Sequence, residues 1–385
     1  MTQDAAAILE KLIGFDTVSR NSNLPLIEWV EDYLAGHGVD SHRVYDETGE
    51  KANLIATIGP ADVPGIALSG HTDVVPVDGQ NWSTDPFAAK TMDGKLYGRG
   101  ASDMKGFCAC VLAAVPAMAK ADLKEPFHIV LSYDEEIGCI GVRGALREMA
   151  EWPVRPRACI VGEPTKMQVV IGHKTKRSIR VHVKGKAGHS SLAPNFVNAV
   201  EYAARLIAHI SDIGRELGES GASDPLYDVG HTTAHVGLIE GGAQLNIVPE
   251  TCWFDYEFRV IAEDDADALV ERVERHAREV LEPAMHAVHP DTGFTFEMLS
   301  SVEGLDTGPE EDVVALTKAL AKRNDHAKVA FGTEGGLFRT MAGIPTVVIG
   351  PGDIGRAHKA DEYIALDELA AGSAFLDRLI AEQSR

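Results

Sequence analysis

A short apolar strand followed directly by histidine and aspartate is the sequence feature that most limits what this chain can fold into. The apolar run 65–68 closes at Gly70 and predicts a buried strand. His71 and Asp73 follow two residues apart, so both side chains can point the same way. Asp103 comes later, in a glycine-rich turn. An imidazole with one carboxylate beside it and another within reach is what a metal site and its supporting residues require.

Length and charge narrow the class of protein. At 385 residues the chain exceeds the usual size of one core, which predicts two domains. Its 36 basic and 58 acidic residues give a net charge of −22, which disfavours nucleic acid or an anionic membrane as partner and favours cationic small molecules. The five cysteines have no zinc or redox spacing and predict reduced core thiols. Without a signal peptide or an apolar run approaching ~20 residues, we expect a cytoplasmic protein.

The first 161 residues alternate between two apolar patterns, helical spacing and short continuous runs. We expect helices at 5–13, 26–34, 107–118 and 144–150, and strands at 53–58, 65–69, 127–132 and 158–161. This alternation of strand and helix is typical of an α/β layer, so we predict an α/β domain with a largely parallel sheet.

A different pattern begins near residue 177. Strands alternating apolar and polar residues are expected at 177–184, 234–239, 252–260 and 294–298, with helices at 197–210 and 263–281. The order β-α-β-β-α-β is the ferredoxin-like plan. We therefore predict that residues 177–302 form an inserted domain. Residues 1–176 and 303–385 would form the first domain, which resumes with helices at 313–320 and 366–380 and a strand at 345–350.

Further acidic and imidazole side chains follow predicted strands of the first domain. Glu135 and Glu136 come after one such strand, Glu163 after the next, and His358 after the strand near residue 345. Open parallel sheets place their sites at these carboxyl ends. Taken alone, each of these residues is more simply a surface charge, a helix cap or a strand end. Their common position is what indicates a site.

The composition of this set predicts its chemistry. Adjacent carboxylates after a buried strand are costly unless a cation lies between them. Two histidines and three carboxylates suit two zinc-like ions with Asp103 bridging them. Glu135 then stays free to act as general base, and Asp73 to orient His71. A water bridging two such ions loses a proton more readily, which supplies a nucleophile near neutral pH.

Five motifs together resemble a known family over essentially the whole chain, the zinc-dependent acetylornithine deacetylase / succinyl-diaminopimelate desuccinylase peptidases. They are residues 69–76, 98–106, 134–138, 162–165 and 357–358. The resemblance implies two zinc sites per subunit, made by His71, Asp103 and Glu163 and by Asp103, Glu136 and His358. It also implies a catalytic role for Glu135 as base and proton shuttle, Asp73 as the partner of His71, and a non-proline cis peptide bond after Asp103. Cobalt or manganese would fit the same ligands.

The resemblance extends to the inserted domain, which would serve as a lid and form a homodimer. Residues 184–191 resemble the segment whose histidine, here His189, reaches the active site of the partner subunit to stabilise an oxyanion. The alternative for His189 is a plain turn residue. Asn246 and Arg259 resemble a substrate-positioning pair, in which a guanidinium suits a substrate carboxylate. For Arg259 the alternative is a salt bridge on the polar face of its strand.

The loop 332–338 resembles the deacetylase branch of the family more than the desuccinylase branch. It marks Thr333, Glu334 and Gly335 as substrate-binding residues, and Glu334 is a hypothetical partner for the ammonium group of a basic amino acid. We therefore expect hydrolysis of the N2-acetyl amide of N2-acetylornithine to ornithine and acetate, a step of arginine biosynthesis. The alternatives are a desuccinylase, an N-acetylcitrulline deacetylase or a dipeptidase.

Two other classes of function are disfavoured. A metal-binding scaffold without turnover would be expected to lose Glu135, which ligates no metal in the family arrangement and is intact here. A nucleotide-binding α/β sheet would carry a glycine motif that cradles phosphates after one of its strands, and none follows any predicted strand.

Overall fold

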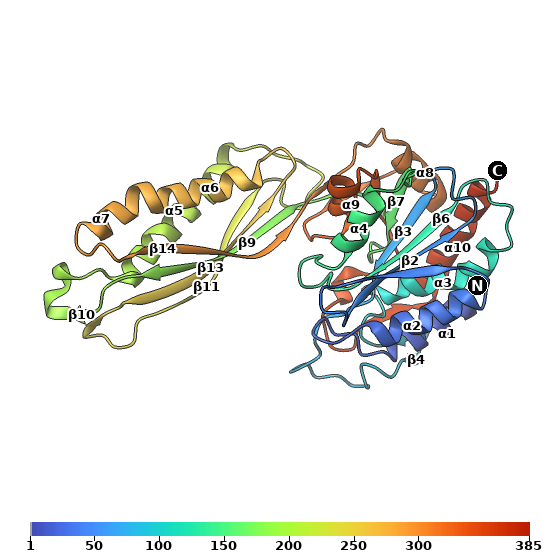
Figure 1. The fold of residues 1–385 in the computed structure, drawn as a ribbon, viewed down its shortest axis with the longest axis horizontal. Helices are drawn as coiled ribbons and strands as arrows, with labels where there is room; N and C mark the ends of the chain where they lie inside the picture. Colours follow the sequence, from blue (N-terminus) through green and yellow to red (C-terminus); the bar gives the residue numbers. More distant parts are fainter. Residues whose placement is uncertain (1) are drawn as a thin grey trace. The chain divides into compact units, whose positions relative to one another are not determined.

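The computed structural model describes residues 2–385, and the chain divides into two compact units (Figure 1). The first unit runs to His173 and resumes over Leu305–Lys328 and Thr333–Arg385, and the second comprises Lys174–Gly304 with Val329–Gly332. Each unit has a hydrophobic core of its own. Among the described residues, no helix has the length and apolar character needed to cross a membrane.

The first unit is built on a nine-stranded sheet in the order β1-β2-β6-β3-β7-β17-β8-β15, with β16 beside β8. Its strands are β1 (Ser41–Tyr45), β2 (Ala52–Ile58), β3 (Ile66–His71), β6 (Phe127–Ser132), β7 (Ala158–Val161), β8 (Val170–His173), β15 (Leu305–Asp306), β16 (Ala327–Val329) and β17 (Thr346–Val348). The central strands β6, β3, β7 and β17 are parallel, whereas the pairs β1–β2, β2–β6, β17–β8 and β8–β15 are antiparallel. The predicted α/β fold with a mainly parallel sheet is confirmed at this centre.

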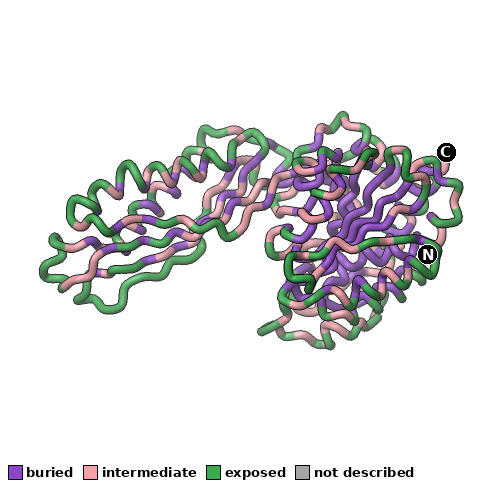
Figure 2. Tube along the Cα trace, in the orientation of Figure 1, coloured by how far each residue is buried: buried purple, intermediate pink, exposed green. Residues whose placement is uncertain are grey.

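Helices complete the first unit. They are α1 (Thr2–Ile13), α2 (Leu24–Ala35), α3 (Lys105–Met118), α4 (Val142–Ala150), α8 (Asp312–Ala321), α9 (Gly335–Ala342) and α10 (Leu366–Gln383). Helix α3 packs against α1, α10 and β3, while α4 packs against α9. An apolar helix with no polar face needs burial on all sides, and α3 is buried along nearly its whole length (Figure 2). Its first turn therefore lies deep in the core, directly after the loop that carries Asp103.

A small three-stranded sheet ties a late segment to an early one. It consists of β4 (Lys90–Met92), β5 (Lys95–Tyr97) and β18 (Tyr363–Ala365), in the order β18-β5-β4. The pairing of β5 with β18 places the residues before Tyr363 next to the glycine-rich loop 98–103.

The second unit is a four-stranded antiparallel sheet in the order β11-β13-β9-β14. Its main elements are β9 (Thr175–Lys184), α5 (Ala199–Ser220), β11 (Thr233–Gly241), β13 (Thr251–Val260), α6 (Ala266–His276), the π-helical turn Ala277–Leu281, α7 (Glu282–His286) and β14 (Gly293–Val302). Strand β13 alternates buried and half-buried residues, because one face of the sheet packs on the core shared with α5 and α6. The element order is β-α-β-β-α-β.

A short pair of antiparallel strands extends the second unit beyond this sheet. Strand β10 (Gly188–His189) pairs with β12 (Ile247–Val248), and a 3₁₀ helix, Ser190–Asn195, follows β10. This pair carries His189 and lies next to Asn246.

Candidate metal centre

Three neighbouring parallel strands deliver most of the predicted site. His71 is the last residue of β3, and Glu163 follows β7 by two residues. Glu135 and Glu136 follow β6, which lies on the other side of β3 from β7. Because carboxyl ends of parallel strands meet at one edge of the sheet, these side chains come together there.

The first cluster consists of His71, Asp103 and Glu163, all of them buried. The His71 Nε2 atom lies 3.2 Å from Asp103 Oδ1 and 4.0 Å from Glu163 Oε1. All three donor atoms lie within 4.8 Å of one another. One nitrogen and two oxygens at such spacing suit a zinc-like cation.

The second cluster consists of Asp103, Glu136 and His358, with donor atoms again within 4.8 Å of one another. The His358 Nε2 atom lies 3.2 Å from Asp103 Oδ2 and 3.0 Å from Glu136 Oε2. Asp103 thus turns one oxygen toward each cluster, which is the geometry of a bridging carboxylate. The peptide bond between Asp103 and Met104 is cis, as the family resemblance implies.

The electrostatics of the site call for cations. Burial raises the pKa of Glu163 well above its ordinary value, and the neighbouring Asp103 carboxylate adds to the rise. Hydrogen bonds to Asp103 and Glu136 raise the pKa of His358 to about 10. Carboxylates crowded at this edge of the sheet repel one another in a buried site, and divalent cations would relieve that repulsion. The donor set therefore fits two such ions.

Asp73 supports the site more widely than the sequence predicts. His71 Nδ1 lies 2.9 Å from the backbone carbonyl of Asp73 and 3.6 Å from its Oδ1 atom. The Asp73 carboxylate itself accepts hydrogen bonds from the Ser19 hydroxyl (2.7 Å) and from the amides of Glu135 (3.1 Å) and Glu136 (3.3 Å). Burial alone would raise the pKa of Asp73, but hydrogen bonding to His71 and Ser19 outweighs it and lowers that pKa. Asp73 thus ties His71 to the segment after β6, a contact that strand spacing does not reveal.

Glu135 belongs to neither cluster, but it precedes Glu136 in the chain and interacts electrostatically with His71 and Asp103. Its Oε1 atom accepts a hydrogen bond from the Cys139 thiol at 3.3 Å. Burial raises the pKa of Glu135 well above its ordinary value, and the adjacent Glu136 carboxylate adds to the rise. A carboxyl group whose pKa is raised holds a proton more readily than an ordinary one, which suits a group that accepts a proton and passes it on.

The residues predicted to bind substrate in the first unit lie at the start of α9. The segment 332–338 is therefore only in part a loop, since α9 begins at Gly335. Glu334 is buried, and its carboxylate accepts hydrogen bonds from the hydroxyls of Ser69 (3.2 Å) and Ser132. Burial raises the pKa of Glu334 to about 7. Thr333 is buried as well, and its hydroxyl accepts a hydrogen bond from the Gly335 amide at 3.0 Å.

The other predicted site residues lie in the second unit. His189 is exposed and its Nδ1 atom lies 2.7 Å from the Ser191 hydroxyl. Asn246 lies in an exposed loop next to β12. The Arg259 guanidinium donates to both carboxylate oxygens of Glu257, at 3.1 and 3.2 Å. This is the strand-face salt bridge that the sequence left as the alternative.

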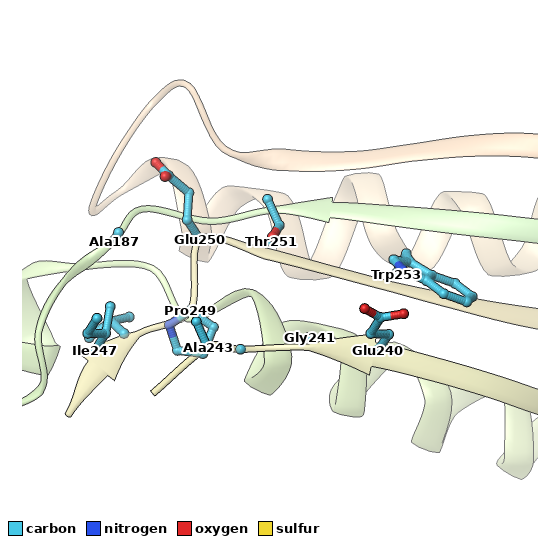
Figure 3. Close-up of a pocket in the computed structure, with 11 residues that line it drawn as sticks. Ala187, Glu240, Gly241, Ala243, Ile247, Pro249, Glu250, Thr251 and Trp253 are labelled. Atoms are coloured by element: carbon cyan, nitrogen blue, oxygen red, sulfur yellow. The ribbon is translucent and has the colours of Figure 1, made fainter. Parts of the chain in front are cut away.

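A pocket of about 370 Å³ opens in the second unit, between the ends of β11 and β13 (Figure 3). Its lining includes Ile247 and Pro249, which follow Asn246, together with Glu240, Glu250 and Trp253. It contains none of the residues of the two clusters.

Comparison with solved structures identifies proteins of similar fold. The aminopeptidase PepT from Bacillus cereus matches with a TM-score of 0.78 at 21% identity, covering 100% of this chain and 99% of that one. The M20 family metallo-carboxypeptidase Sso-CP2 from Sulfolobus solfataricus matches with a TM-score of 0.77 at 19% identity, covering 99% of each chain. At such identity the likeness concerns the fold alone. The fold and the site together define an α/β protein with two clusters of candidate metal ligands near the carboxyl ends of its parallel strands.

Sequence comparison identifies the family. The model of peptidase family M20/M25/M40 matches residues 67–382. A protein of Myxococcus xanthus named acetylornithine deacetylase is 34% identical over 97% of this chain and 96% of its own length. The chain belongs to peptidase family M20/M25/M40 and is a metal-dependent hydrolase. The resemblance that the sequence motifs indicate is thereby confirmed.

Proposed function

We propose that this hydrolase removes the acetyl group from N2-acetyl-L-ornithine, releasing L-ornithine and acetate in arginine biosynthesis. The observation that carries the proposal is the pair of donor clusters sharing Asp103, together with the Glu135 carboxyl group, which belongs to neither cluster and interacts with residues of both. The choice of amide rests on the relative named acetylornithine deacetylase, which aligns over nearly the whole chain.

We propose two zinc ions per chain, one held by His71, Asp103 and Glu163 and the other by Asp103, Glu136 and His358. When bound, such ions polarise the amide carbonyl and make a bound water acidic. Glu135 would accept the proton that the attacking water loses. As the C–N bond breaks, Glu135 would pass this proton to the departing nitrogen, so that the amine leaves neutral. Asp73 would keep His71 and the segment of Glu135 in register throughout.

The second unit would complete the site. In a homodimer formed through residues 177–302, His189 would reach the active site of the partner subunit and donate a hydrogen bond to the oxyanion that forms there at the acetyl carbonyl. Asn246 and Arg259 would bind the α-carboxylate, and Arg259 would exchange Glu257 for the substrate. These assignments rest on the family resemblance of their segments.

The Glu334 carboxylate is occupied by hydrogen bonds from two serine hydroxyls. It would therefore favour a cationic substrate through its electric field rather than by direct contact. Replacing Glu334 by Gln should narrow the ratio of kcat/KM between N2-acetylornithine and the neutral N-acetylmethionine. An unchanged ratio would remove Glu334 from substrate selection. Thr333 and Gly335 would shape the same wall of the site.

The experiment that tests the function is a substrate panel on protein loaded with a defined metal. The panel contains N2-acetylornithine, N-succinyl-diaminopimelate, N-acetylcitrulline and a dipeptide. We expect kcat/KM for N2-acetylornithine to exceed the others by about tenfold or more, the scale that a buried polar contact supports. A higher value for any other member would reassign the substrate.

Replacing Glu135 by Ala separates an enzyme from a metal-binding scaffold. Removal of a general base costs about 10²- to 10⁴-fold in kcat, and we expect such a loss with both ions still bound. Metal content measured on the same sample shows that the ions remain. Equal turnover of Glu135→Ala and wild type would contradict the proposed mechanism.

A further inference from the structure

A buried carboxylate that belongs to neither cluster holds the loop carrying Asp103. Glu362 is 1% exposed and accepts hydrogen bonds on both of its oxygens. Oε2 accepts from the Arg99 guanidinium at 2.8 Å and from the Gly100 amide at 3.1 Å. Oε1 accepts from the amides of Ser102 at 2.9 Å and Asp103 at 3.1 Å. The position of Asp103 is therefore tied directly to this one side chain.

The same network continues to the other ligand segment through Arg99 and Gln80. Arg99 is as deeply buried as Glu362, and it donates to the side-chain Oε1 atom of Gln80 and to the backbone carbonyl of Lys359 at 3.3 Å. The side-chain Nε2 atom of Gln80 donates to the backbone carbonyl of His358 at 2.9 Å. One connected set of hydrogen bonds thus runs from the amide of Asp103 to the carbonyl of His358.

These contacts exceed what is needed to attach β18 to the rest of the unit. The backbone already does that, since β18 pairs with β5 and the Gly98 amide donates to the Glu362 carbonyl at 3.0 Å. A carboxylate is costly to bury unless its lone pairs are satisfied, and here all the satisfying donors belong to the segment 99–103. The side chain of Glu362 therefore acts on the loop.

We propose that Glu362, with Arg99 and Gln80, is a positioning network that fixes the bridging carboxylate of Asp103 relative to His358. It would thereby set the affinity of the ion shared by Asp103, Glu136 and His358. The inference rests on the proposed two-ion centre. Partners that orient metal ligands typically contribute 10- to 100-fold in metal affinity.

The primary test replaces Glu362 by Gln and measures metal binding. An amide keeps the shape of the carboxylate but offers one accepting oxygen, so either Arg99 and Gly100 or Ser102 and Asp103 lose their acceptor. Metal-free protein is titrated with Co²⁺ and followed by visible absorption. The ion held by Asp103, Glu136 and His358 should bind about 10- to 100-fold more weakly than in wild type. Activity should fall at limiting metal and recover when metal is added in excess.

Glu311→Gln provides the matched control. The Glu311 carboxylate, in the same unit, also accepts hydrogen bonds from an arginine, Arg339 (2.9 and 3.0 Å), and from a backbone amide, that of Gly308 (2.8 Å). It touches no residue of either cluster, so its loss should leave both metal affinities unchanged. The far-UV circular dichroism of the metal-free variants shows whether each is folded.

Gln80→Ala removes the side chain that joins Arg99 to the His358 carbonyl, together with its hydrogen bond from the Trp82 indole, and leaves the buried ion pair of Arg99 and Glu362 intact. We expect it to weaken binding of the ion at the second cluster about 3- to 10-fold, a smaller effect because Glu362 still accepts every hydrogen bond from the segment 99–103. If Glu362→Gln does not fold, this variant decides. The proposed positioning role would be rejected if a folded Glu362→Gln variant bound the ion of the second cluster as tightly as wild type does. If that variant does not fold, the same result in Gln80→Ala would reject it. Failure of wild type to bind two ions would instead overturn the proposed function.

Discussion

At the scale of single residues, Asp73 has the most distributed role in the site. Its carboxylate holds the amides of Glu135 and Glu136 and the Ser19 hydroxyl, while its carbonyl faces His71. Replacing Asp73 by Asn leaves one accepting oxygen, so metal affinity and kcat should each fall about 10- to 100-fold. Ser19→Ala removes one of these hydrogen bonds and should cost far less in the same metal titration and assay. Equal effects of the two substitutions would refute this account of Asp73.

The buried side chain of His128 should make the free energy of unfolding depend on pH. It lies buried in β6, where Nδ1 is 3.0 Å from the Thr57 hydroxyl, and burial lowers its pKa to about 4. The unfolded chain has a histidine pKa of about 6.5, so between these values it binds more protons than the folded chain. Stability should therefore fall as the pH falls, by about 2 kcal/mol between pH 7 and pH 5 from this residue. His128→Gln should flatten the curve of Tm against pH, and parallel curves for variant and wild type would contradict the assignment.

At the scale of elements, the end of β7 must lie close against α3. A Cβ atom on Gly162 would come within 1.9 Å of the Phe107 ring, so the helix can approach only a glycine. Gly162→Ala should destabilise the first unit by about 1–3 kcal/mol and weaken metal binding by displacing the adjacent Glu163. Gly144→Ala is the matched control in α4, where a Cβ meets only ordinary contacts at 3.4 Å or more. It should leave stability unchanged or raise it by about 0.5–1 kcal/mol. Calorimetry that shows Gly162→Ala as stable as Gly144→Ala would contradict this packing.

Elements with a strong apolar pattern could be predicted from the sequence. The predicted strands 127–132 and 158–161 coincide with β6 and β7, because both are fully buried apolar runs. Helix α5 extends ten residues beyond its predicted end at 210, and in this mostly exposed second half only Ile213 and Leu217 continue the apolar stripe. Strands β1, β8 and β15 are not predicted, since pairing with distant strands forms them more than their own composition does. Helix α9 opens with two glycines, which are poor helix formers, and depends on burial.

The site shows the same division between local and distant information. The candidate metal ligands could be predicted because each follows a recognisable strand or motif. The buried state of Glu334 could not, because it depends on serines from β3 and β6 that approach it only in the fold. Ser19 and Glu362 were likewise missed. For Glu362 the available signal was an acidic residue four positions after His358, which is too weak to separate from a surface charge.

At the scale of the whole molecule, the chain leaves the first unit at the end of β8 and returns to it at the start of β15, the strand next to β8. His173 of β8 pairs with Leu305 of β15, so a short turn could replace residues 174–304. Because each unit has its own core, the shortened chain should fold and bind two metal ions. It should lose at least about 100-fold in kcat/KM, since it lacks His189, Asn246 and Arg259. Full activity would exclude a catalytic role for the second unit, and failure to fold would contradict the independence of the first.

The central claim is that two divalent ions share Asp103 at the carboxyl ends of β3, β6 and β7. It is tested most directly by anomalous diffraction from crystals grown with Zn²⁺, recorded at the zinc absorption edge. The account predicts two peaks about 3.5–4 Å apart on either side of Asp103, one next to His71 and Glu163 and the other next to Glu136 and His358. A single peak, or peaks away from Asp103, would contradict it.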